Sequence, residues 1–172
     1  MSNTASPVAL AAASTEVPND VRDTIARLQM EYVHAIDNDQ LERWPQLFTE
    51  QCLYQIIPRA EHEQGRRIGV WFCEGRGMLE DRVSSIREVN VYEPHVYRHV
   101  IGPTEVTGHK DGNWTAQTSF IVVRTMHDGE MHLFSAGRYV DEIVMEGAVA
   151  RLRKRVVVTD SWRYDTLVAI PI

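Results

Sequence analysis

Apolar residues in the first part of the chain recur at helical spacing. Five positions alternate at separations of four and three residues and so share one face of an α-helix: Val21, Ile25, Leu28, Tyr32 and Ala35. We expect Asn19 and Asp20 to cap the start of this helix. Asp37 is a poor helix former and ends the pattern after Ile36. The pattern predicts an amphipathic helix with a buried stripe.

A second apolar face follows an acidic turn. Asp39 and Glu42 have the spacing of a capping box, in which each of the two side chains bonds the backbone N–H of the other residue. Helical spacing then continues at four apolar positions: Leu41, Trp44, Leu47 and Phe48. The sequence predicts a short second helix that meets the first at an acidic elbow.

The middle of the chain changes from one strand-like segment to a third helix. Residues 52–57 are β-prone and predict a strand that Pro58 ends, and the polar segment 59–67 predicts a surface loop. A short apolar run follows at 68–73. The third helix is predicted by three positions: Leu79, Val83 and Ile86.

From His95 onward, alternation of side chains replaces helical spacing, as in a β-strand, with a break or bulge at Gly102-Pro103. Three dipeptides typical of hairpin turns separate the alternating runs that follow: Asp111-Gly112, Asp128-Gly129 and Glu146-Gly147. The pattern predicts a meander of long antiparallel strands that continues to residue 161.

Helices first and a long antiparallel sheet last indicate the α+β class. The sheet must bury its apolar face, and the N-terminal helices are free to cover it. We therefore expect one cone-shaped domain over residues 19–172, with a curved sheet wrapped around the helices. Residues 1–18 are expected to be a flexible arm, because their apolar run at 8–13 is too short for a signal peptide or a membrane span.

Composition narrows the possible partners. The net charge is −6, only Lys110 and Lys154 of the 18 basic residues are lysines, and the arginines are scattered, so nucleic acid is not an expected partner. Excess arginine fits ion pairs at a protein interface, and equally the codon usage of a GC-rich genome. Cys52 and Cys73 form no paired pattern, which favours a reducing, cytoplasmic location.

The order of helix, elbow, helix and meander resembles the fold of nuclear transport factor 2-like proteins. The residues that carry this likeness are Tyr32, Ala35, Asp37, Leu41, Trp44 and Phe48. Residues 78–102, 120–142 and 151–172 more specifically resemble small (β) subunits of aromatic-ring-hydroxylating Rieske dioxygenases. Within that family, the sequence is most similar to terephthalate and salicylate oxygenases at four short segments: Asp81-Arg82, Arg87-Glu88, Tyr92-Glu93 and Tyr97-Arg98-His99.

This resemblance implies a structural role in the oxygenation of an aromatic acid such as terephthalate or salicylate. In that family the large α subunit of an α3β3 hetero-hexamer carries the Rieske 2Fe–2S cluster and a mononuclear non-haem iron, supplied with electrons from NAD(P)H through ferredoxin or reductase. Charged positions where the likeness is densest are candidates for structural ion pairs or for the contact with the α subunit: Arg82, Arg87, Glu93, Arg98 and Arg138. Ordinary solvated charge is the alternative for each.

The residues themselves argue against a cofactor or a metal on this chain. A Rieske cluster needs C-x-H and C-x-x-H pairs, and neither Cys52 nor Cys73 begins one. His95 and His99 lie on a predicted strand, where four residues at roughly 3.3 Å each separate them by about 13 Å, too far to share one ion. We expect no catalytic residue here and an inactive isolated chain.

Two alternatives remain open. A free-standing acid/base enzyme of the isomerase, dehydratase or cyclase type would use Asp37 with Tyr32, His34 or Tyr54. Each of these residues also has a structural explanation. Asp37 ends a helix, Tyr32 belongs to its apolar stripe, His34 lies off that stripe, and Tyr54 alternates in a strand. A ligand-binding module would need a cavity, which six large side chains can fill instead: Trp44, Phe48, Trp71, Phe72, Phe120 and Phe134.

Overall fold

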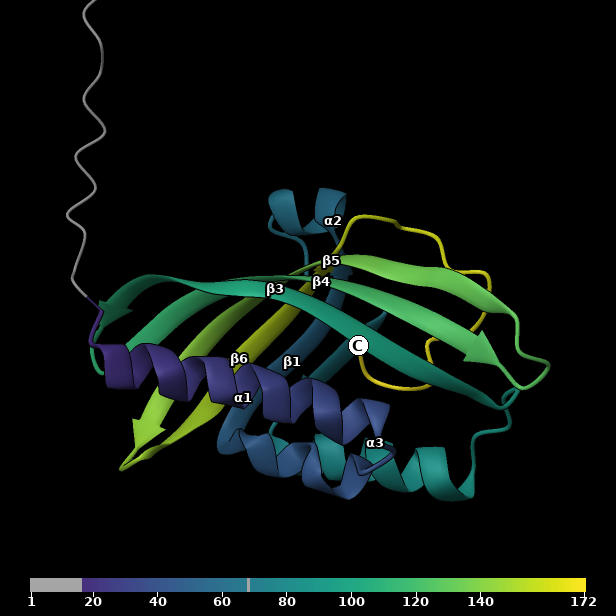
Figure 1. The fold of residues 1–172 in the computed structure, drawn as a ribbon, viewed down its shortest axis with the longest axis horizontal. Coiled ribbons are helices and arrows are strands. Elements are labelled where there is room, and N and C mark those ends of the chain that lie inside the picture. Colours follow the sequence, from purple (N-terminus) through teal and green to yellow (C-terminus); the bar gives the residue numbers. More distant parts are fainter. Residues whose placement is uncertain (1–16, 68) are drawn as a thin grey trace, which may run out of the picture.

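The computed structural model describes residues 17–67 and 69–172, which form an α+β fold with the long helices in the hollow of a curved six-stranded sheet (Figure 1). The elements are α1 (Asn19–Asp37), η1 (Leu41–Arg43), η2 (Pro45–Leu47), β1 (Phe48–Pro58), α2 (Arg59–Glu63), β2 (Trp71–Glu74), α3 (Arg76–Glu88), β3 (His95–Lys110), β4 (Asn113–Met126), β5 (Met131–Glu146) and β6 (Val149–Thr159). The predicted arm at 1–18 lies outside the described residues apart from its last two. The predicted α+β cone is confirmed.

The first helix, α1, is confirmed, and its stripe residues Ile25, Leu28 and Tyr32 are buried. The predicted caps are wrong: Pro18 occupies the N-cap position, no side chain caps the helix, and Asn19 and Asp20 lie within the first turn. The fixed φ of proline suits a helix entry, and an acidic residue in the first turn is favourable beside the positive end of the helix dipole.

The predicted second helix is wrong in type. Two 3-10 turns, η1 and η2, replace it, because Pro45 has no N–H to donate and its ring clashes with a preceding turn. The capping box is wrong as well: Gln40 is the N-cap of η1, and the side chains of Asp39 and Glu42 bind Arg87. The burial expected of this segment holds, since Trp44 is fully buried.

The sheet has the strand order β2-β1-β6-β5-β4-β3. The three predicted hairpins pair β3 with β4, β4 with β5 and β5 with β6, and β3 shifts register between Ile101 and Thr104, where Gly102-Pro103 predicted a bulge. Parallel pairing of β1 with β6 joins β1 to these three hairpins, and β2 pairs with β1 at the edge of the sheet. Residues 59–63 form the short helix α2 on the side of the sheet opposite α1 and α3 (Figure 1), where the sequence predicted only a loop.

Aromatic side chains fill the hollow between the sheet and the helices. Trp44 packs edge-on against Phe48, Tyr54 and Trp71, with ring centroids 5.6, 5.1 and 6.5 Å away. Of the six side chains expected to fill the cone, five belong to the core or pack on it. Phe72 is the exception at 39% exposed, because it alternates with the buried Trp71 and Cys73 along β2 and points to the other face.

Candidate functional site: the mouth of the cone

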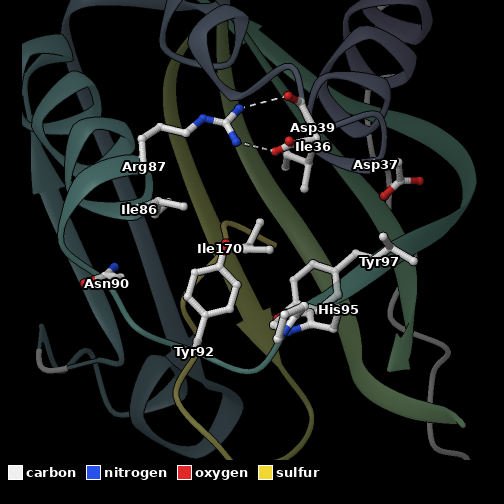
Figure 2. A pocket seen from close by; sticks show the side chains of 12 residues that line it. Ile36, Asp37, Asp39, Ile86, Arg87, Asn90, Tyr92, His95, Tyr97 and Ile170 are labelled. Atoms are coloured by element: carbon white, nitrogen blue, oxygen red, sulfur yellow. Dashed lines mark hydrogen bonds and ion pairs between the residues drawn. The ribbon is translucent and has the colours of Figure 1, made fainter. Parts of the chain in front are cut away.

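A pocket of about 370 Å³ opens where the end of α1 meets the end of α3 and the start of β3. Figure 2 shows Asp37 and Asp39 from the end of α1 and the elbow, Arg87 from α3, and His95 with Tyr97 from β3. Ile170, from the segment that follows β6, closes the inner side. This pocket holds titratable groups of the kind that an acid/base enzyme would need. Its geometry therefore decides between a structural subunit and a free-standing acid/base enzyme.

The Asp37 carboxylate pairs with His99 inside the cone. One oxygen of Asp37 lies 2.6 Å from Nδ1 of His99, and the other accepts the His99 backbone N–H at 2.9 Å. Both side chains are buried, at 2% and 0% exposed. Asp37 therefore does more than end α1, because it ties the helix to β3. Nothing in the sequence joins two residues 62 positions apart, so this contact was not predicted.

The two tyrosines of the enzyme hypothesis hold the chain's own backbone. Tyr32 donates its hydroxyl to the main-chain oxygen of Ile172 at 2.7 Å, and Tyr54 donates to the same oxygen at 3.0 Å. Burial raises the pKa of both phenols, that of Tyr54 well above its ordinary value. His34 is exposed on the far side of α1. The structure therefore does not bring Tyr32, His34 and Asp37 together as one acid/base set.

Two of the charged candidates, both on α3, make contacts within the chain. Arg87 binds Asp39 at 2.7 Å and Glu42 at 2.8 Å, and its hydrogen bonds lower the pKa of Glu42. Arg82 places its guanidinium 4.5 Å from the ring centroid of Trp71. Arg87 thus fixes the acidic elbow against α3, and Arg82 covers an edge of the core.

The other three candidates lie on or near the outer sheet. Glu93, before β3, is exposed and approaches His127 at 3.4 Å. Arg98 is 65% exposed and lies 3.6 Å from Asp37. Arg138 stands on β5, opposite Ser119 of β4 and Val158 of β6 in the register. The five candidates therefore form no single cluster, but Arg98 and Arg138 both point to the outer face.

A buried ion pair was missed by the sequence analysis. Arg155 of β6 donates to Asp141 of β5 at 2.9 and 2.7 Å, and Gln29 of α1 donates to Asp141 at 2.7 Å and accepts from Arg155. The Arg155 guanidinium also stacks over Tyr32 and Tyr139, 3.9 and 4.2 Å from the ring centroids. Burial alone would lower the pKa of Arg155, but Asp141 keeps it raised. The sequence did contain a signal for this ion pair, because the Asp and the Arg face each other across the predicted third hairpin.

The described cysteines and histidines do not fit an iron centre. Within residues 17–67 and 69–172, no three His, Cys, Asp or Glu side chains are placed to hold one ion. Cys52 and Cys73 are free and buried, and burial raises the pKa of Cys52 to about 11, which disfavours the thiolate that a metal would need. His95 and His99 lie on strand β3, as expected, and His99 is committed to Asp37.

Comparisons with known proteins point to one family. A family model described as "Ring hydroxylating beta subunit" matches residues 32–163. The chain is 38% identical to the anthranilate 1,2-dioxygenase small subunit of Burkholderia cepacia, over 86% of this chain and 92% of that one. It is 37% identical to a β subunit of the terminal oxygenase component of terephthalate 1,2-dioxygenase from Comamonas sp., over 86% and 96%.

A solved structure agrees with the sequence comparisons. The β subunit of an aromatic-ring-hydroxylating dioxygenase from Novosphingobium aromaticivorans superposes with a TM-score of 0.82 at 37% identity, covering 90% of this chain and 98% of that one. No described helix is long and apolar enough to cross a bilayer. These matches over most of the chain show that this chain belongs to the family of small (β) subunits of aromatic-ring-hydroxylating dioxygenases.

Proposed function

We propose that this chain is the non-catalytic small subunit of an aromatic-acid oxygenase and stabilises the large α subunit that carries out the chemistry. The observation that carries the proposal is that the chain's own side chains fill the interior of the cone. Tyr32 and Tyr54 bind the backbone of Ile172, and Trp44 packs against Tyr54 and Trp71. An enzyme of this shape would need that interior for its substrate, whereas a scaffold needs it for stability.

The partner supplies the reaction chemistry in this proposal. The large subunit carries the Rieske cluster and the mononuclear iron, which together activate oxygen with electrons from NAD(P)H by way of ferredoxin or reductase. The two subunits form an α3β3 hetero-hexamer in the cytoplasm, and the isolated small subunit is inactive. Two observations support this division of labour: Tyr32 binds the backbone of Ile172 and His34 is exposed, so neither joins Asp37, and burial raises the pKa of Cys52 away from the thiolate that a metal would need.

We place the substrate among aromatic carboxylic acids. The two relatives named above are subunits of dioxygenases named for anthranilate and terephthalate, and each of these compounds is a benzene ring with at least one carboxylate. Salicylate, expected from the sequence likeness, has the same chemistry. The small subunit contributes to turnover by holding the large subunits in register and not by touching the substrate.

Sedimentation of co-expressed subunits tests this proposal. We expect this chain and a large oxygenase subunit containing C-x-H and C-x-x-H pairs, sought in a neighbouring reading frame, to migrate as one complex of hetero-hexamer mass. All aromatic-acid-dependent oxygen uptake should be found in that complex, and the purified small chain should show none. A small chain that remains a separate peak beside an active large subunit would contradict the proposal.

A further inference from the structure

The segment that follows β6 is held in place by side chains. Residues 160–172 leave the end of β6, turn back and finish between the sheet and α1 without forming a helix or a strand (Figure 1). At the start of the segment, the N–H of Asp160 donates to the carbonyl of Ala136 on β5 at 2.9 Å. Beyond it, no backbone-to-backbone hydrogen bond joins residues 161–172 to the rest of the chain that the structure describes. We call residues 161–172 the strap.

An ion pair anchors the middle of the strap to β4. Asp165 accepts two hydrogen bonds from the guanidinium of Arg124, at 2.5 and 3.2 Å. The Arg124 side chain is 6% exposed, whereas the Asp165 side chain is 65% exposed. Arg124 also lies 4.9 Å from the ring centroid of Phe134, and the ring of Tyr164 in the strap lies 5.3 Å from the same centroid. The strap therefore shields an arginine from water and supplies the carboxylate that pairs with it.

The end of the strap is buried inside the cone. Val168 and Ile172 are 2% and 0% exposed. The carbonyl of Val168 accepts the indole N–H of Trp71 at 2.9 Å. Ile172 donates its N–H to the hydroxyl of Tyr54 at 3.1 Å, and its main-chain oxygen accepts from the hydroxyls of Tyr32 and Tyr54. Three aromatic side chains thus satisfy the buried backbone groups that a neighbouring strand would otherwise satisfy.

Between these anchors the strap is open to solvent. Trp162 and Leu167 are 79% and 64% exposed. Native proteins open locally at segments with many solvent-exposed groups and few buried contacts, while their core strands open only on global unfolding. The strap can leave the cone without breaking any pairing between strands, because its anchors are the Arg124–Asp165 pair and the side-chain contacts of its buried end.

We propose that the strap opens as one unit, with its hinge at Asp160, while the sheet and the helices stay folded. Asp160 stays in place because its side chain pairs with Arg59 at 2.7 Å and its N–H remains bonded to β5. Ile170 of the strap forms the inner side of the mouth pocket, so opening joins that pocket to the aromatic interior of the cone. This conformational change belongs to the chain by itself and does not depend on the proposed function.

Hydrogen exchange of the purified full chain, followed by NMR, tests the proposal at two protons that the strap protects: the Ile172 amide and the Trp71 indole N–H. In the wild type, both should have protection factors at least about tenfold lower than that of the Val157 amide in the middle of the sheet. Asp165→Ala should lower both factors by a further tenfold or more, roughly, because the closed strap then buries an unpaired Arg124 charge that opening returns to water.

Asp160→Ala is the matched control, since the Arg59–Asp160 pair lies at the hinge and is kept when the strap opens. It should leave both protection factors unchanged, and an effect as large as that of Asp165→Ala would overturn the proposal. A folded Asp165→Ala chain with an unchanged Ile172 amide would show that the anchors act separately. Wild-type protection of Ile172 equal to that of Val157 would show that the strap opens only on global unfolding. This last comparison needs no variant, so it decides the matter even if Asp165→Ala does not fold.

Discussion

Asp141→Ala is expected to lower the free energy of unfolding by about 3 to 5 kcal/mol, because it leaves the Arg155 charge without a partner inside the protein. Both side chains of the pair are 0% exposed, and Gln29 bonds to both of them. The loss should lower the melting temperature by roughly 10 °C for a domain of this size. Chemical and thermal unfolding of the purified chain, followed by circular dichroism, measure the effect.

Glu142→Ala is the matched control, because Glu142 pairs with Lys154 one register position away on the same two strands. That pair is 39% exposed on each side and points to the opposite face of the sheet. An exposed pair contributes about 0 to 1 kcal/mol, so this variant should unfold close to the wild type. Equal effects of the two substitutions would contradict the importance given to the buried ion pair.

Trp44→Ala should cost roughly 3 to 5 kcal/mol and reduce the yield of assembled oxygenase by depleting folded small subunit. Trp44 is fully buried, and the three aromatic rings around it would lose their common neighbour. Unfolding of the purified variant gives the stability change, and the amount of co-expressed complex gives the effect on assembly.

Trp162→Ala provides the comparison for Trp44, since Trp162 is 79% exposed after β6. Removing an exposed ring creates no cavity, and surface substitutions typically change stability by about 0.5 kcal/mol or less. A Trp44→Ala chain as stable as Trp162→Ala would show that the cone's interior is not the packed scaffold core described above.

Periodicity predicted the parts of the fold that local patterns determine. The stripe from Val21 to Ala35 gave α1, and the Asp-Gly and Glu-Gly dipeptides gave the hairpins of the sheet, because both signals depend on neighbours in sequence. The second helix was predicted wrongly because its apolar spacing outweighed Pro45, which breaks the helix into two turns. Helical turns as short as α2 carry too few positions to establish a period.

Side-chain partners were harder to predict than elements. Asp37 was expected to end a helix, and only the tertiary fold brings His99 of β3 to it. Arg155 and Asp141 look like alternating strand charges in the sequence, yet a register bulge between Glu142 and Ile143 accompanies their pairing inside the cone. Sequence likeness selected Arg87 and Arg138 for their charge, but it could not distinguish an arginine that binds within the chain from one that points to the outer face of the sheet.

Asp37→Asn tests most directly whether this chain supplies a catalytic group. An asparagine keeps an oxygen for the His99 backbone N–H, and its amide can donate to Nδ1 of the other His99 tautomer, so the cost should be about 1 kcal/mol. A general base cannot survive the change, since losing a proton-transfer partner typically lowers the rate by about 10² to 10⁴.

The measurement is oxygen uptake per assembled complex, with whichever of anthranilate or terephthalate the wild-type complex oxidises. A scaffold role predicts equal uptake for wild-type and Asp37→Asn complexes once each is normalised to the amount of assembled oxygenase. An Asp37→Asn complex that assembles normally yet loses a hundredfold or more of its turnover would contradict the scaffold role and restore the acid/base hypothesis.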